Sequence, residues 1–360
     1  MDDAQPTSTA GTGDPVRGAP RLPAVDDAAF AAALDDALDV FYGQATTAEA
    51  RFYARLPATA ADPNWQLTGE VVGPFSHRTR CLPATVKFRR PLGSSSAALS
   101  SAVLASPGPS QAADLLVEAA VPDPCFWQPE QPYYYEVSLR LLAGQQTLAT
   151  VRRQLGLRPL GTHGRRFYMQ GKPWVVRAVT PGAALAADAL PADVWQDALD
   201  LGTTLLVAQP PAKLCEQAHR RGVLLMAALD QLSDGALAQE CRRLAQHPAV
   251  GLLLLNADAP WSDACRAAAR NLLVGCRLDP SQQAAERLSS AVPPRAQFVA
   301  LRWPAELSPQ AYADLAAQLA LPVCVEQTPD SFTTLAAAKT ACDRLQRALA
   351  GLGQFAGYLC

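Results

Sequence analysis

The hydrophobic and polar positions of this chain follow two different periods. From about residue 163 to the end, short apolar runs alternate with segments whose apolar residues recur at helical spacing. The clearest run, Val250–Leu255, is opened by His247-Pro248 and closed by the polar Asn256. A continuous apolar run of that length between helical segments is typical of a strand buried on both faces of a parallel sheet.

The same pattern recurs often enough to predict a closed barrel. The predicted strands are Trp174–Val179, Thr204–Ala208, Val223–Leu229, Val250–Leu255, Leu272–Arg277, Phe298–Trp303, Val323–Val325 and Phe355–Leu359. Helical segments separate consecutive strands, and this alternation favours a (β/α)8 barrel. The region holds only about 190 residues, near the lower limit for the fold, so we expect short βα loops and no deep cleft.

In the preceding region, 48–162, hydrophobic and polar positions alternate with a shorter period. Its strand-like segments are separated by Pro-, Gly- and Ser-rich joints, which predicts an antiparallel β-sandwich. Residues 93–111 are expected to form a long loop within it. Residues 1–25 are rich in Pro, Gly, Thr and Ala, which is typical of a disordered leader.

Between leader and sandwich, residues 26–47 contain apolar positions at helical spacing, which predicts an amphipathic helix. No helix is predicted after the last barrel strand. We therefore hypothesise that the helix at 26–47 packs on the barrel where an eighth helix would lie.

Composition narrows the function. Apolar residues make up 49% of the chain and the formal net charge is −2, so we expect a large core and no nucleic-acid partner. No apolar run is long enough for a membrane span, and the N-terminus lacks the apolar stretch of a signal peptide. Nine cysteines and four histidines are dispersed without CxxC pairs, which favours free thiols, no metal site and a cytoplasmic location. No dinucleotide, P-loop or nucleophile-elbow motif is present, so no cofactor is expected.

Four motifs carry a resemblance to a known family. They are Trp127-Gln-Pro-Glu-Gln-Pro-Tyr-Tyr-Tyr135, Leu155-Gly-Leu-Arg-Pro-Leu160, Phe167-Tyr-Met-Gln-Gly-Lys-Pro-Trp-Val-Val-Arg177 and the His247-Pro248 strand. In this order they resemble glycoside hydrolase family 2, over roughly residues 120–360. The resemblance implies an immunoglobulin-like β-sandwich at 48–162 followed by a compact (β/α)8 TIM barrel at 163–360.

The resemblance also assigns roles to residues at the ends of barrel strands. In the family, glutamates after strands four and seven are the general acid/base and the nucleophile. Glu326 lies at or next to the nucleophile position, whereas Ala257 stands at the acid/base position. Alanine has no proton to donate, and Asp258 is the nearest carboxyl in the sequence that we consider as a displaced acid. Arg177, Asp230 and Asn256 match other family positions, and Trp261 and Trp303 are candidate sugar-stacking surfaces.

Three functions remain open from the sequence. The first is a catalytically degenerate family 2-like pseudoenzyme that binds a carbohydrate or a protein partner. The second is an active O-glycosyl hydrolase, a β-glycosidase that uses Glu326 with a displaced acid such as Asp258 or Asp230. The third is a structural subunit of a larger assembly. Because paired carboxyls cleave glycosides at separations of about 5 to 10 Å, the distance from Glu326 to the next carboxyl separates the first two.

Overall fold

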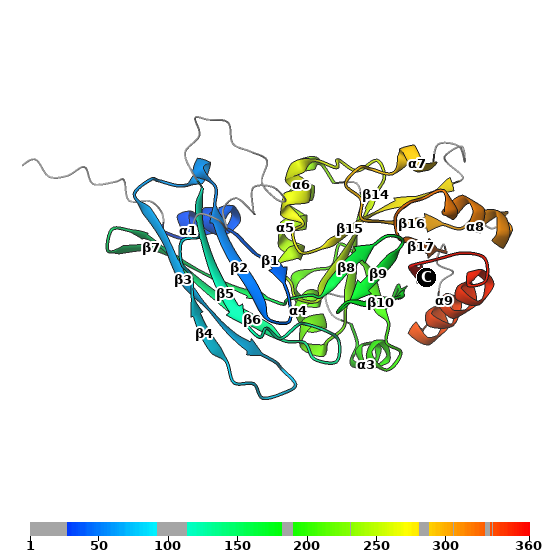
Figure 1. Cartoon of the computed structure of the whole chain (residues 1–360), viewed down its shortest axis with the longest axis horizontal. Helices are drawn as coiled ribbons and strands as arrows, with labels where there is room; N and C mark the ends of the chain where they lie inside the picture. Colours follow the sequence, from blue (N-terminus) through cyan, green and yellow to red (C-terminus); the bar gives the residue numbers. More distant parts are fainter. Residues whose placement is uncertain are drawn as a thin grey trace, which may run out of the picture.

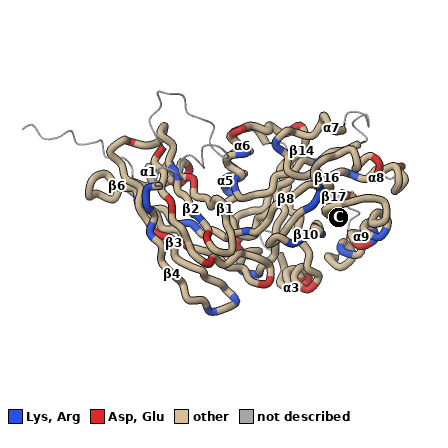
Figure 2. Tube along the Cα trace, viewed as in Figure 1, with Lys and Arg blue, Asp and Glu red and all other residues tan. Residues whose placement is uncertain are grey.

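The computed structural model describes residues 27–91, 114–181, 190–230, 232–280, 288–304, 306–327, 332 and 334–360. The predicted leader and the whole of the predicted 93–111 loop lie outside these residues. The described chain forms two parts side by side along the long axis, an antiparallel sandwich and a parallel barrel (Figure 1). Basic and acidic positions are interspersed over both parts (Figure 2). Within the described residues, no helix is long and apolar enough to cross a membrane.

Two antiparallel sheets form the sandwich, with strand orders β1-β2-β5 and β4-β3-β6-β7. Inward side chains alternate with outward ones along β6, which is why Tyr135, Val137, Leu139 and Leu141 are all buried in the core between the sheets. The strands are β1 (Asp39–Ala45), β2 (Glu49–Leu56), β3 (Trp65–Phe75), β4 (Ala84–Lys87), β5 (Leu115–Pro122), β6 (Tyr134–Ala143) and β7 (Gln146–Leu155), with a 3-10 turn η1 (Ala58–Ala60).

The N-terminal helix α1 (Asp27–Ala37) lies on the sandwich and not on the barrel. Its Leu34 is buried in the sandwich core, Phe30 meets Trp65 edge-on at 5.8 Å, and Asp35 pairs with Arg153 of β7 at 2.6 Å. The hypothesis that it replaces an eighth barrel helix is therefore wrong. The helix is also shorter than 26–47, because from Asp39 the chain pairs with β2 as a strand.

A small sheet, β8 (Leu160–His163), β9 (Arg166–Met169) and β10 (Lys172–Trp174), joins the two parts. The Gly-Lys-Pro turn makes the β9–β10 hairpin, and Gly171 takes a φ of 73°, which glycine adopts without strain. Phe167 of β9 is fully buried and meets Phe298 of the barrel interior at 5.3 Å. The hairpin therefore closes the end of the barrel where its strands begin.

The barrel is closed, with eight parallel strands in sequence order, as predicted. They are β11 (Val176–Val179), β12 (Thr204–Ala208), β13 (Leu225–Leu229), β14 (Val250–Asn256), β15 (Leu273–Leu278), β16 (Phe298–Arg302), β17 (Val323–Glu326) and β18 (Gly357–Leu359). The helices of the described part are α3 (Ala192–Asp200), α4 (Ala212–Arg221), α5 (Asp234–Ala245), α6 (Asp263–Ala268), α7 (Leu288–Ala291), α8 (Pro309–Ala317) and α9 (Leu335–Leu349).

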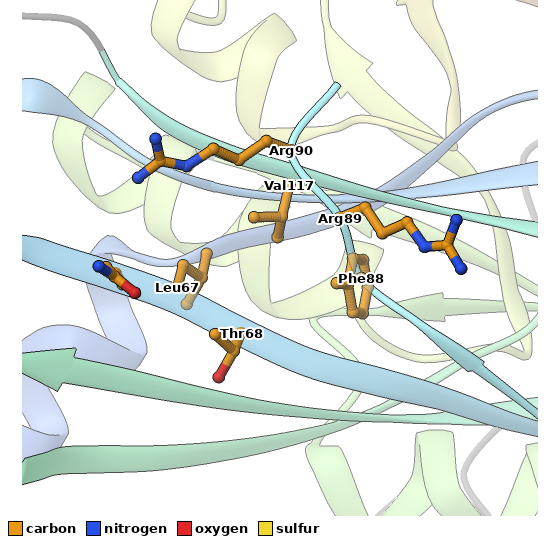
Figure 3. Close-up of a pocket in the computed structure, with 7 residues that line it drawn as sticks. Leu67, Thr68, Phe88, Arg89, Arg90 and Val117 are labelled. Carbon is orange, nitrogen blue, oxygen red and sulfur yellow. The ribbon is translucent and has the colours of Figure 1, made fainter. Parts of the chain in front are cut away.

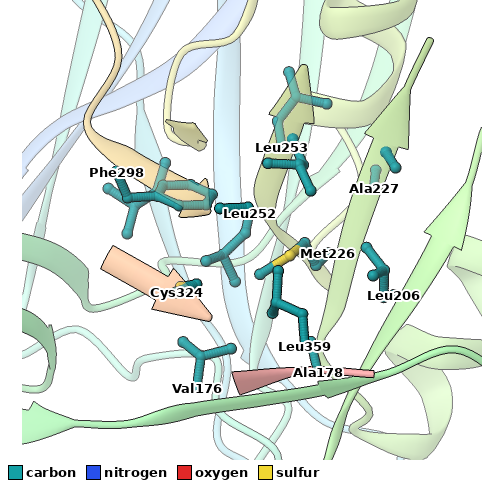
Figure 4. Close-up of a cluster of buried hydrophobic side chains, with 14 of the residues drawn as sticks. Val176, Ala178, Leu206, Met226, Ala227, Leu252, Leu253, Phe298, Cys324 and Leu359 are labelled. Carbon is teal, nitrogen blue, oxygen red and sulfur yellow. The ribbon is translucent and has the colours of Figure 1, made fainter. Parts of the chain in front are cut away.

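Apolar side chains fill the barrel interior. Leu252, Met226, Phe298 and Leu359 converge inside the ring of strands (Figure 4). Gly275 makes room for this packing, because a Cβ atom there would lie 2.4 Å from the Phe298 ring. The interior is thus a packed core, and any site must lie at an end of the barrel or outside it.

Candidate functional site

The inward residues at the carboxyl ends of the strands form a polar layer above this core. Side chains alternate along a strand, so Glu326 faces inward like Cys324 two residues earlier, and Arg302 faces inward like Phe298 (Figure 4). Arg277 follows the inward position of Gly275 in the same way. We call this layer, together with the adjoining Asp279, the mouth cluster. It consists of Asp230, Asn256, Arg277, Asp279, Arg302 and Glu326.

One guanidinium joins the two carboxylates of the mouth cluster. Arg277 Nε donates to Glu326 Oε1 at 2.9 Å and to Oε2 at 3.0 Å, while its Nη1 lies 3.4 Å from Asp230 Oδ1. Beside them, Arg302 Nη1 donates to Asp279 Oδ2 at 2.9 Å. Each arginine therefore has an acidic partner, and positive and negative groups alternate around the mouth.

Burial dominates the electrostatics of Glu326. Its side chain is only 8% exposed, and loss of hydration raises its pKa above the ordinary value. The positive charges of Arg277 and Arg302 act in the opposite direction, but they do not cancel the burial. The carboxylate is thus an expensive buried charge that depends on Arg277.

The sequence did not single out Arg277. Arg302 is the cation beside Glu326 in the barrel register, but it is not the one that hydrogen-bonds to the carboxylate. The direct partner comes instead from the next strand but one. The predicted strand Leu272–Arg277 ended on this arginine, and its inward phase was the only indication available from the sequence.

The position to which the resemblance assigns the general acid/base carries no proton donor. Ala257 starts the turn after β14 and packs against the barrel core, so only a methyl group stands there. Asp258 is exposed in the same turn, and it makes no hydrogen bond or ion pair with any described residue. Asn256 lies at the end of the strand, beside Arg277 in the register.

The two candidate tryptophans are tied to the protein backbone. The indole of Trp261 donates to the carbonyl of Asn256 at 3.1 Å, and that of Trp303 donates to the carbonyl of Leu307 at 3.0 Å. Tyr312 of α8 stacks on Trp303 with ring centroids 5.2 Å apart. One face of Trp303 is therefore covered by the protein itself.

Arg177 does not join the mouth cluster. Its neighbours Val176 and Ala178 point into the barrel, so Arg177 points outward (Figure 4). It donates to Gln346 Oε1 at 2.6 Å and its Nε lies 3.3 Å from Asp343 Oδ1, both on α9. The structure thus brings together Asp230, Asn256 and Glu326, and places Arg177 outside the barrel.

Chemically, the mouth cluster holds one pair of carboxylates at a useful separation. Because Asp230 and Glu326 contact the same guanidinium, their nearest oxygens are at most about 9 Å apart, a bound that includes the spacings of both retaining and inverting glycosidases. The described residues contain no group of three His, Cys, Asp or Glu side chains that could hold a metal ion. Proton transfer and charge stabilisation are the chemistry that this cluster offers.

A separate cavity of about 300 Å³ lies on the sandwich. Leu67, Phe88 and Val117, which line it, belong to the sandwich core. Arg89 and Arg90 extend from its edge in opposite directions (Figure 3). Two guanidiniums that diverge do not make a common binding site, so this cavity adds nothing to the mouth cluster.

Comparison with known proteins places this architecture. The family model described as "Glycosyl hydrolases family 2" matches residues 58–158, most of the sandwich. No curated protein sequence matches the chain significantly.

Solved structures match over both parts. A β-glucuronidase from Bacteroides uniformis is 13% identical with a TM-score of 0.56, covering 90% of this chain and 45% of that one. A putative β-galactosidase from Bacteroides fragilis is 14% identical with a TM-score of 0.56, covering 90% and 54%. An FMN-binding β-glucuronidase from Facaelibacterium prausnitzii L2-6 is 13% identical with a TM-score of 0.58, covering 90% and 55%.

The chain spans about half the length of these proteins. At such identities the likeness concerns the fold, while the match to the sandwich concerns the sequence. The sandwich sequence is thus similar to glycoside hydrolase family 2, and the sandwich-plus-barrel fold is similar to that of these solved structures.

Proposed function

We propose that this chain has lost glycoside hydrolysis and acts as a binding or scaffolding protein with a family 2-like fold. The observation that carries the proposal is the methyl group of Ala257 where the resemblance implies a glutamic acid. A general acid typically contributes about 10² to 10⁴-fold to such a reaction. The bond from Arg277 to both oxygens of Glu326 adds support, because it occupies the carboxylate that would attack the sugar.

The test uses aryl β-glycosides whose leaving groups depart without acid assistance. We expect no release of aryl alcohol above background from gluco, galacto, manno or glucurono substrates. Glu326→Gln and the exposed control Asp258→Asn should give the same background. Release by the wild type that Glu326→Gln abolishes would overturn the proposal, because it would show a working nucleophile.

An active hydrolase is the second candidate, and one observation favours it. Asp230 and Glu326 both contact Arg277, so their nearest oxygens lie no more than about 9 Å apart, as the paired carboxyls of glycosidases do. In that case release would occur, and Asp230→Asn would abolish it as completely as Glu326→Gln. Inversion at the sugar carbon, followed by NMR of the first-formed product, would distinguish this route from a covalent one.

A further inference from the structure

A second pocket lies at the other end of the barrel, where β11 and β18 begin. Its volume is about 280 Å³, and it opens between α9, the segment before β18 and the β9–β10 hairpin (Figure 1). The residues that matter for its chemistry are Arg166, Trp174, Gln346, Gln354, Phe355 and Tyr358. None of them belongs to the mouth cluster.

A hydrogen-bonded chain fixes the orientation of Gln346 in the pocket wall. Lys339 pairs with Asp343 at 2.7 Å, Asp343 pairs with Arg177, and Arg177 donates to Gln346 Oε1 at 2.6 Å. Because arginine only donates, the amide oxygen must face Arg177. The amide NH₂ group of Gln346 has no partner among the described residues. It is therefore held as a donor for something else.

Tyr358 contributes a second polar group. It alternates with the inward Leu359 and so lies on the outer face of β18, next to Arg177 in the register. The residue is only 3% exposed and lines the pocket, yet its hydroxyl has no hydrogen-bond partner among the described residues. The hydroxyl oxygen is not among the fully buried unpaired atoms of the described residues, so it opens on the pocket and is available to a ligand.

The remaining groups are aromatic and cationic. Trp174 and Phe355 are partly exposed and line the same pocket. Arg166 is exposed at the pocket and has no ion pair with any described residue. Gln354 adds another exposed amide. The pocket thus combines apolar ring faces with several hydrogen-bonding groups, two of them held firmly by the fold.

We propose that this pocket binds a single sugar ring, such as the terminal unit of a glycan. The hydroxyls of a pyranose would accept from Gln346 and pair with Tyr358, and its C–H face would pack on an aromatic ring. The volume is slightly below the usual range of about 300–1,000 Å³ for small-molecule pockets, which suits one ring. Because the pocket lies outside the barrel wall and shares no residue with the mouth cluster, the proposal holds whether or not the mouth cluster hydrolyses glycosides.

The experiment is a titration of the full chain with methyl β-glycosides of glucose, galactose and mannose and with glucuronic acid, followed by saturation-transfer NMR. We expect saturable binding of at least one sugar. Tyr358→Phe, which removes only the hydroxyl, should weaken it about tenfold, and Trp174→Ala should weaken it further. Tyr133→Phe, a matched change of a half-buried tyrosine on the sandwich, should bind like the wild type.

Three outcomes would overturn the proposal. They are no binding of any sugar, unchanged binding by a folded Tyr358→Phe variant, and binding lost in Glu326→Gln but retained in Trp174→Ala. The last would place the sugar at the mouth cluster. Thermal unfolding of each variant shows whether it is folded, and the aryl glycoside assay reports on the mouth cluster independently.

Discussion

At the scale of single residues, the Glu326–Arg277 pair decides what the barrel mouth can do. A carboxylate that is 8% exposed is stable only beside a compensating charge. Arg277 supplies that charge, and Asp230 extends the network at the more solvated edge. The same contacts that favour the ionised form of Glu326 against its burial also restrain its oxygens, so structural support and reactivity compete at this residue.

We expect Arg277→Met to destabilise the protein by about 3–5 kcal/mol, because it leaves Glu326 as an unpaired buried carboxylate. Urea unfolding measures this. The double variant with Glu326→Gln should recover much of the loss, since a neutral amide needs no cation. Arg302→Met is the matched control and should cost less, because its partner Asp279 has a further interaction and because the Arg302 side chain is more exposed than that of Arg277. Additive effects of Arg277→Met and Glu326→Gln would contradict the proposed dependence.

At the scale of elements, the motifs that carry the family resemblance form the joint between sandwich and barrel. Trp127 is buried, and its indole donates to His219 Nδ1 of α4 at 3.0 Å. Asn271 of the barrel holds both backbone groups of Tyr42 in β1, donating to its carbonyl at 2.7 Å and accepting from its N–H at 3.2 Å. Short motifs far apart in the sequence are thus one interface.

This joint should be sensitive to acid through His219. Burial lowers the pKa of His219 from about 6.5 to about 3, and Trp127 occupies its acceptor nitrogen. Between about pH 6.5 and pH 3, His219 therefore binds a proton in the unfolded chain but not in the folded chain. Stability should be fully present above about pH 6.5 and fall as the pH drops towards 3, by about 2 kcal/mol between pH 7 and 5.

Unfolding free energies of the wild type and His219→Gln at several pH values measure this contribution. In His219→Gln, the unfolding free energy should fall less steeply as the pH drops. The exposed control His163→Gln should show the same pH dependence as the wild type. An unchanged slope in His219→Gln would mean that other groups cause the acid sensitivity. His247, whose pKa burial lowers to about 4, is the first of these to examine.

At the scale of the whole molecule, one buried arginine couples the two parts. Arg158 leaves the sandwich, is 6% exposed, and donates to the carbonyls of His247, Pro248 and Asn271 of the barrel at 2.8, 3.2 and 3.0 Å. Burial lowers its pKa. Only a planar fork of donors reaches three carbonyls at once, so the two parts should unfold together.

We expect Arg158→Met to destabilise the protein by about 3 kcal/mol or more and to split its thermal unfolding into two transitions. Arg158→Lys should destabilise the protein almost as much, because a single ammonium group cannot hydrogen-bond to all three carbonyls. Calorimetry measures both effects. Arg140→Met on the exposed face of β6 is the control. A single, unshifted transition in Arg158→Met would show that the coupling lies elsewhere.

The sequence by itself determined the architecture. The spacing of apolar residues along the chain shows which faces of each strand or helix are buried, and these faces determine how the elements pack into layers. Eight buried runs separated by helical segments predicted the barrel and the bounds of its strands to within two residues, and alternation predicted the sandwich. It placed Glu326, Asp230 and Asn256 at strand ends and an alanine at position 257. Tertiary structure decided the rest. The chain from Asp39 onward forms strand β1 because it hydrogen-bonds to β2. Helix α1 packs on the sandwich because the apolar surface that it covers is there. Arg277 contacts Glu326 and Arg177 points outward, because the closed barrel determines which side chains face one another across neighbouring strands.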